Sequence, residues 1–113
     1  MIKHDIVIIG GGPAGMAAAV AAYDNGVRDV VIIDREEKLG GILKQCIHNG
    51  FGLHKLGKEL TGPEYAAHYE KAVSERGIKV LYETMVTDIS ADRIVTAQST
   101  EGILKIKAKA VVL

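Results

Sequence analysis

The chain has 113 residues, 48% of them hydrophobic, so it can form one domain with a core and no more. Its 14 basic and 14 acidic side chains cancel, which excludes the basic surface of a protein that binds nucleic acid or an acidic membrane. We find no charged leader and no apolar run of the ~20 residues that a membrane span needs. The single cysteine, Cys46, cannot form an internal disulfide, so we expect a cytoplasmic protein.

The first predicted elements are a strand, a turn and a helix. An apolar run at residues 6–9 breaks into Gly-Gly-Gly-Pro-Ala-Gly at 10–15 and continues as an alanine-rich helix over 16–22. The unpaired N–H groups and the dipole at the start of such a helix favour a diphosphate. The alternative is an ordinary turn in a glycine-rich chain.

Each position of this glycine cluster has a role in a dinucleotide site. Gly10 permits the tight turn, Gly12 leaves room for a pyrophosphate against the backbone, and Gly15 lets the helix lie close to the strand. Pro13 suits the first helical turn, because the N–H that it lacks would have no partner there. With Ala14, these residues are the predicted phosphate-binding turn.

A second buried strand is predicted at residues 29–33, after the helix ends at Asn25-Gly26. It closes on Asp34, about twenty residues past the glycines, where an acid can accept both hydroxyls of a ribose. The alternative is an aspartate that only caps the strand. The glycine cluster and Asp34 together favour a dinucleotide site.

The following stretch, residues 42–60, is predicted to be irregular, and loops of this length are uncommon unless they are functional or disordered. Cys46 could be a thiol near a cofactor or a small buried apolar residue, and we favour the second. His48 and His54 could contact cofactor or substrate. Without a second cluster they are weak zinc ligands, so we predict no metal site.

A second helix is predicted to begin at residues 61–64, Thr-Gly-Pro-Glu, which match a capping box, and to end at Gly77. A third parallel strand should follow at residues 78–82, reached by a right-handed crossover. The apolar side chains of the helix recur at helical spacing and are predicted to lie in the core: Tyr65, Tyr69, Ala72 and Val73.

Three short strands complete the chain as an antiparallel meander, at residues 84–90, 93–99 and 102–109. In the last strand Leu104, Ile106 and Ala108 alternate with three lysines, Lys105, Lys107 and Lys109. The simplest interpretation of the lysines is a solvated face whose charge also guards a sheet edge. Because residues 110–113 are wholly apolar and the chain stops within a strand, we interpret residues 1–113 as part of a longer protein.

The order of these motifs resembles the FAD-binding domain of glutathione-reductase-like flavoproteins, the pyridine nucleotide-disulfide oxidoreductase superfamily. The resemblance rests on GGGPAG, on Asp34, on Gly40 and Gly41 six and seven residues beyond it, and on the meander after the third strand. It implies an α/β fold: a three-layer Rossmann-like FAD-binding domain, with a meander inserted in a parallel sheet, truncated at its C-terminal end. It also implies that Asp34, Arg35, Gly40 and Gly41 hold ribose and pyrophosphate, and that backbone at Val86 meets the adenine.

A narrower resemblance lies in residues 40–54 and 60–65. This region is similar to the flavin subunits of opine and sarcosine oxidases, and to FAD/NAD-dependent dehydrogenases that accompany glycerol-3-phosphate dehydrogenase-like proteins. Disulfide reductases of the superfamily carry a redox pair of cysteines. This chain has only Cys46, which argues against thiol-disulfide chemistry.

The resemblance implies a FAD-dependent oxidoreductase that passes electrons between a nicotinamide nucleotide or small metabolite and an acceptor. NAD(P)H and partner subunits would bind parts of the parent that this chain lacks, so the chain alone should be inactive and could self-associate. Two alternatives remain. One is a Rossmann dehydrogenase whose only dinucleotide is NAD, and the other is a non-catalytic nucleotide-binding fragment.

Overall fold

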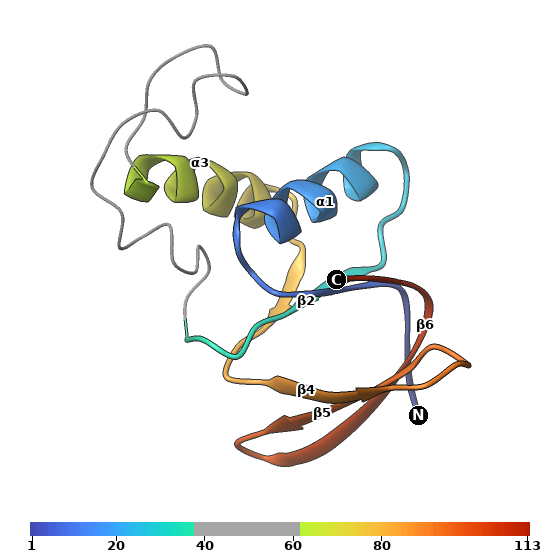
Figure 1. Ribbon diagram of the computed structural model, residues 1–113. Helices are drawn as coiled ribbons and strands as arrows, with labels where there is room; N and C mark the ends of the chain where they lie inside the picture. The colour runs from blue at the N-terminus through green and yellow to red at the C-terminus, as the bar shows by residue number, and fades with distance from the viewer. Residues whose placement is uncertain (38–61) are drawn as a thin grey trace.

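The computed structural model describes residues 1–37 and 62–113, and Figure 1 shows their arrangement in space. Two helices and six strands make up this part of the chain. In chain order they are β1 (Ile2–Ile9), α1 (Pro13–Asp24), β2 (Val30–Ile33), α3 (Gly62–Glu75), β3 (Lys79–Leu81), β4 (Met85–Ile89), β5 (Ile94–Ser99) and β6 (Gly102–Val112). Neither helix is long and apolar enough to cross a membrane.

The described strands form one sheet in the order β3-β2-β1-β6-β5-β4. β1, β2 and β3 run parallel to one another, with Ile8 opposite Ile32 and Ile32 opposite Val80. β4, β5 and β6 are the predicted antiparallel meander. The three parallel strands and the meander are therefore confirmed, although β1 begins four residues before its predicted start and β6 ends three residues after its predicted end.

β6 joins the two parts of the sheet because it is long enough to pair with both. Its first half pairs with β5, and its second half runs parallel to β1, so that Ile106 lies opposite both Val95 and Ile2. Figure 1 shows the result as three layers, with the helices on one face of the parallel strands and the meander folded over the other. This is the predicted three-layer architecture.

The core on the helix side consists of apolar residues from β1, β2 and the two helices. Ile8 and Ile32 lie under Met16 and Ala19 of α1, and α3 adds Ala66, Tyr69 and Val73. Tyr69 and Val73 are thus core residues, as predicted, and Ala72 is half-buried. The side chain of Tyr65 and the capping residue Thr61 lie outside the described residues.

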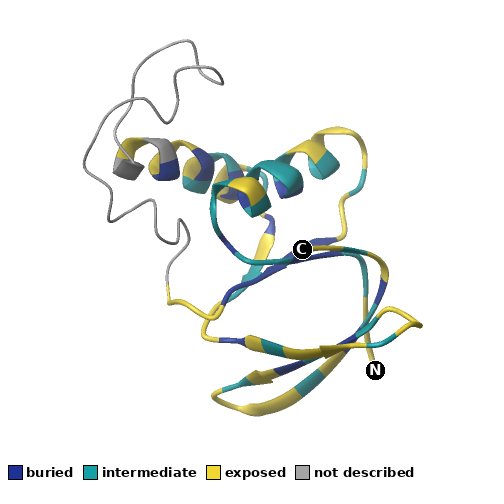
Figure 2. Cartoon of the chain, in the orientation of Figure 1, coloured by how far each residue is buried: buried dark blue, intermediate teal, exposed yellow. Residues whose placement is uncertain are grey.

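The second core lies between the parallel strands and the meander. The alternate residues of β1 and β2 point to this side, because successive side chains of a strand face opposite ways. Figure 2 shows the resulting buried strip along the middle strands. The members of this core are Val7, Val31, Ile33, Val95, Ile106 and Ala108. Burial on both faces explains why β2 and the second half of β1 are apolar runs instead of alternating ones.

The structure corrects the interpretation of the lysines of β6. Lys105 and Lys109 are exposed, but β6 is an interior strand, and the edge strands among the described residues are β3 and β4. Lys107 lies opposite both Lys3 of β1 and Ile94 of β5, so this lysine does not guard a sheet edge. The apolar run after them is also paired on one side, since Ala110 and Val112 lie opposite Ile6 and Ile8 of β1. Self-association of the chain remains a prediction.

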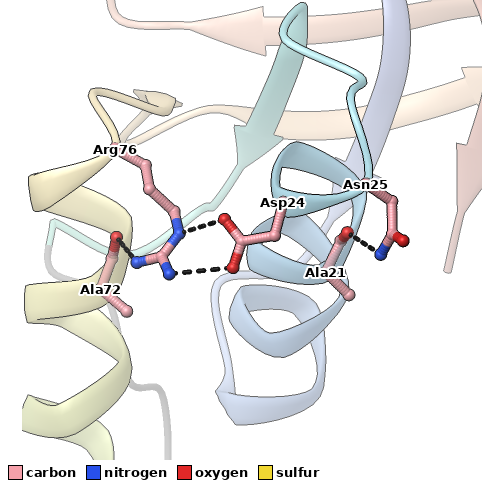
Figure 3. A network of polar contacts seen from close by, with 5 residues as sticks. All are labelled: Ala21, Asp24, Asn25, Ala72 and Arg76. Atoms are coloured by element: carbon pink, nitrogen blue, oxygen red, sulfur yellow. Dashed lines mark hydrogen bonds and ion pairs between the residues drawn. The ribbon is translucent and has the colours of Figure 1, made fainter.

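An exposed ion pair joins the two helices, as Figure 3 shows. The guanidinium of Arg76 donates to both carboxylate oxygens of Asp24, at 2.7 and 2.9 Å, and to the carbonyl of Ala72 at 2.9 Å. The hydrogen bond between the two side chains lowers the pKa of Asp24 and raises the pKa of Arg76. Arg76 thereby connects the ends of α1 and α3 on the side of the molecule away from the glycine turn.

Candidate cofactor-binding site

The turn between β1 and α1 brings the helix close against the strand. Gly10 has a φ of +105°, a conformation that favours glycine, and its N–H donates to the carbonyl of Ile33 at 2.8 Å. A Cβ on Gly15 would lie 2.1 Å from the carbonyl oxygen of Gly10 and 3.3 Å from Cγ2 of Ile8. Only glycine fits at Gly15 without moving α1.

The start of α1 is open to an anion. Gly12 is the N-cap without a side-chain hydrogen bond, Pro13 follows it, and the first turn holds no acidic residue. The N–H groups of Ala14 and Gly15 therefore have no partner within the helix, and no nearby carboxylate of the first turn competes for them. Beyond its neighbours in the chain, a Cβ built on Gly12 would meet no heavy atom of the described residues within 4 Å, so these residues leave the space in front of the helix clear.

A hollow of about 340 Å³ lies at this turn. Its lining includes Gly10, Gly12, Pro13, Ala14 and Gly15 from the turn and the helix, together with Val112 and Leu113 from the end of β6. These last two residues were not predicted as part of the site. The only signal for them would have been the parallel pairing of β6 with β1, which places the ends of both strands together.

Asp34 lies beside this turn, since β1 and β2 are neighbours and Ile9 is opposite Ile33. The residue is 7% exposed. Its Oδ1 accepts the N–H of Glu36 at 3.2 Å, whereas its Oδ2 is buried and has no hydrogen-bond partner among the described residues. Buried carboxylate oxygens are normally satisfied, so Oδ2 is suited to a hydroxyl donor of a ligand.

Two residues missed by the sequence analysis hold Asp34 in place. The N–H of Thr84 donates to the carbonyl of Asp34, and the N–H of Glu83 donates to the carbonyl of Glu36, both at 2.9 Å. Thr84 was expected to be the first residue of a meander strand, but β4 begins one residue later. Glu83 has a φ of +48°, and no local sequence pattern signals that conformation.

The other predicted contacts lie around this turn or outside the described residues. The side chain of Arg35 is 74% exposed, with Nε 3.8 Å from a carboxylate oxygen of Glu36. Val86 lies in β4, an edge strand, and its side chain packs against the core beneath the parallel strands. Several predicted residues lie outside the described part: Gly40, Gly41, Cys46, His48 and His54.

Two further observations limit where ligands bind. A larger hollow of about 870 Å³ lies over α3 and β3, lined among others by Glu37, Lys71 and Tyr82. It includes neither the glycine turn nor Asp34, so we do not place the nucleotide there. Within residues 1–37 and 62–113, no three His, Cys, Asp or Glu side chains come together as metal ligands.

Comparison with known proteins identifies the family. The family of FAD dependent oxidoreductases matches residues 5–62, which include the second half of β1, the glycine turn, α1, β2 and Asp34. This chain belongs to the FAD dependent oxidoreductases. The resemblance inferred from the glycine cluster and the acid after β2 is thereby confirmed, and so is FAD as the cofactor of the family.

Two curated relatives show how much of a longer protein this FAD dependent oxidoreductase chain matches. It is 36% identical over 81 residues to a thioredoxin reductase of Ureaplasma parvum, covering 71% of this chain and 25% of that protein. It is 32% identical over 74 residues to the alpha subunit of sarcosine oxidase from a Corynebacterium, covering 66% of this chain and 7% of the subunit. The chain thus spans a quarter or less of these relatives.

The solved structure of bacillithiol disulfide reductase from Bacillus cereus superposes with a TM-score of 0.78 at 19% identity. The superposition covers 96% of this chain and 38% of the reductase chain. At this identity the likeness concerns the fold, and it confirms the predicted Rossmann-like α/β architecture.

Proposed function

We propose that this chain holds the ADP half of FAD in a flavin-dependent oxidoreductase. The observation that carries the proposal is the Oδ2 of Asp34, which is buried and has no partner in the described part of the chain, beside the open N-terminus of α1. A hydroxyl donor fits the first feature and a diphosphate fits the second, and both belong to one adenine dinucleotide. The residues present therefore fit the cofactor of the family.

Each part of the ADP moiety has its own residues in this proposal. The N–H groups of Ala14 and Gly15 bind the pyrophosphate, and Gly12 keeps the approach to them clear. The Asp34 carboxylate accepts the ribose hydroxyls. The backbone of Val86 meets the adenine edge in this proposal, because β4 has a neighbouring strand on one side only among the described residues.

The remaining predicted contacts complete the proposal. Gly10 and Pro13 shape the turn, and Arg35 lies next to the ribose-binding acid. From the sequence pattern, Gly40 and Gly41 also bind the pyrophosphate in this proposal. FAD supplies hydride chemistry when bound, and the residues of this chain bind and orient it. We assign no catalytic residue and no metal ligand.

We also propose an activity for the whole protein of which this chain is a part. Electrons would pass between a nicotinamide nucleotide or small metabolite and an acceptor through FAD, with NAD(P)H bound by a second nucleotide domain. The sarcosine oxidase relative is a subunit of its enzyme, which supports partner subunits here as well. A cytoplasmic location and activity only in the longer parent protein are parts of the same proposal.

An absorbance spectrum tests the proposal. The purified parent protein should show the flavin bands, and heat should release FAD that chromatography identifies. A protein that releases NAD and no flavin would favour the NAD-only Rossmann dehydrogenase, since Asp34 suits either ribose. Titration of the apoprotein with ADP and FAD tests the other alternative, a non-catalytic nucleotide-binding fragment. A fragment that holds only the adenosine half should bind ADP and FAD about equally.

A further inference from the structure

The segment 81–84 holds Asp34 from both sides through its backbone. The N–H of Asp34 donates to the carbonyl of Leu81, and the carbonyl of Asp34 accepts from the N–H of Thr84, both at 2.9 Å. Glu83 then donates its N–H to the carbonyl of Glu36 at 2.9 Å, so the chain after Asp34 is tied as well. The position of the Asp34 carboxylate therefore depends on the conformation of this segment.

Thr84 is the buried residue of the segment. It is 3% exposed, and its hydroxyl donates to the carbonyl of Tyr82 at 2.8 Å. This bond spans Glu83, whose φ of +48° is a conformation that a residue with a side chain seldom adopts. Such a conformation persists when surrounding contacts hold it, and the Thr84 hydroxyl supplies one of those contacts from inside the turn.

The carboxylate of Asp34 has one anchored oxygen and one open oxygen. Oδ1 accepts a hydrogen bond from the N–H of Glu36 at 3.2 Å. Oδ2 is buried and has no hydrogen-bond partner in the described part of the chain. A site that accepts hydrogen bonds in this way needs its acceptor held to within about half an ångström. A change in the turn at Glu83 would move the Glu36 amide and Asp34 together.

We propose that Thr84 is a positioning residue, which keeps the Asp34 carboxylate in the orientation that accepts the ribose hydroxyls of the cofactor. The inference rests on the function proposed above. It predicts that Thr84 affects recognition of the ribose diol in particular, and not only the stability of the domain. A purely structural residue would weaken the binding of every nucleotide alike.

The test compares ADP with 2′-deoxy-ADP on the flavin-free parent protein by calorimetry. A hydrogen bond to a charged group makes the wild-type protein prefer ADP by about tenfold or more. Thr84→Val keeps the shape of the side chain and removes the hydroxyl, and it should reduce this preference to about threefold or less. Thr84→Ser keeps the hydroxyl and should retain the preference. If Thr84→Val does not fold, Thr84→Ala replaces it, and the preference for ADP should fall in the same way.

The outcomes separate this inference from the proposed function. Both the proposed function and the positioning role are supported if the wild-type protein retains FAD and prefers ADP. The same result requires that Thr84→Val loses the preference for ADP and that Thr84→Ser keeps it. An unchanged preference in Thr84→Val overturns the positioning role, even if both nucleotides bind more weakly. Equal binding of the two nucleotides by a wild-type protein that retains FAD also overturns it and leaves FAD binding intact. A wild-type protein that binds neither FAD nor ADP contradicts the proposed function itself.

Discussion

Replacing Gly15 by alanine would force a methyl group against the backbone of the neighbouring turn. The new Cβ would lie 2.1 Å from the carbonyl oxygen of Gly10 and 3.2 Å from its carbonyl carbon. Since these are backbone atoms of a tight turn, no side chain can rotate away to make room. Restoring an ordinary contact requires α1 to move by about 1 Å from β1, in an interior packed as densely as a crystal.

The expected cost follows from that displacement. Overpacking of this kind destabilises a domain by about 1–3 kcal/mol. With a urea dependence of about 1–3 kcal/mol per molar, the unfolding midpoint should fall by about 1 M. Urea unfolding of the flavin-free protein followed by circular dichroism measures the shift, and the free energy of unfolding is compared with that of wild type.

Gly12→Ala provides the matched control. The same methyl group at Gly12 meets no heavy atom within 4 Å in residues 1–37 and 62–113, so the unfolding midpoint should change little. It would instead occupy the space through which we expect the pyrophosphate to approach, and the affinity for FAD should fall. Equal urea midpoints for Gly15→Ala and wild type would refute the close helix-strand contact. Full FAD affinity in Gly12→Ala would refute the placement of the pyrophosphate.

Three further predictions address the ribose, the helix pair and the extent of the enzyme. Asp34→Ala should weaken binding of FAD and ADP by about 1–3 kcal/mol, and unchanged affinities in calorimetry would remove Asp34 from the site. Because Arg76 lowers the pKa of Asp24 below its ordinary value of 3.8, their ion pair stabilises the fold at neutral pH and loses that effect as the pH falls below this value. Arg76→Gln should therefore lower the melting temperature slightly at pH 7 and not at pH 2, since exposed pairs contribute little; an equal loss at both values would contradict the ion pair. A protein made as residues 1–113 should not catalyse NADH-dependent dye reduction, whereas the parent should, because hydride transfer needs donor and flavin within about 3–3.5 Å in a shaped site. Turnover by this chain as a monomer on a sizing column would show that the site is complete.

Much of the fold follows from local patterns. The apolar run at the end of β1 and the wholly apolar β2 mark strands buried on both faces, and the glycine cluster between β1 and α1 marks the turn. The alternation in β6 predicts which residues face the core, and Ile106 and Ala108 are indeed buried. These features depend on the chemistry of neighbouring residues, so the sequence alone reveals them.

The candidate site was predicted in part for the same reason. The position of Asp34 directly after a strand places it at the carboxyl edge of the sheet, beside the turn at Gly10. Its hydrogen-bonding environment could not be predicted. The contacts of Asp34 with Leu81 and Thr84 join residues about fifty positions apart, and no periodic pattern encodes them.

The sequence by itself determined the strands, the helices, the glycine turn and the acid at the end of β2, because these depend on side-chain alternation and backbone conformation within short segments. Only the tertiary structure decided where the meander joins the parallel strands. Lys107 resembled an edge-guarding residue, yet it lies opposite both Lys3 of β1 and Ile94 of β5. Strand order depends on which apolar faces bury each other across the whole chain, and that same packing brings Thr84 to Asp34 and leaves one carboxylate oxygen open.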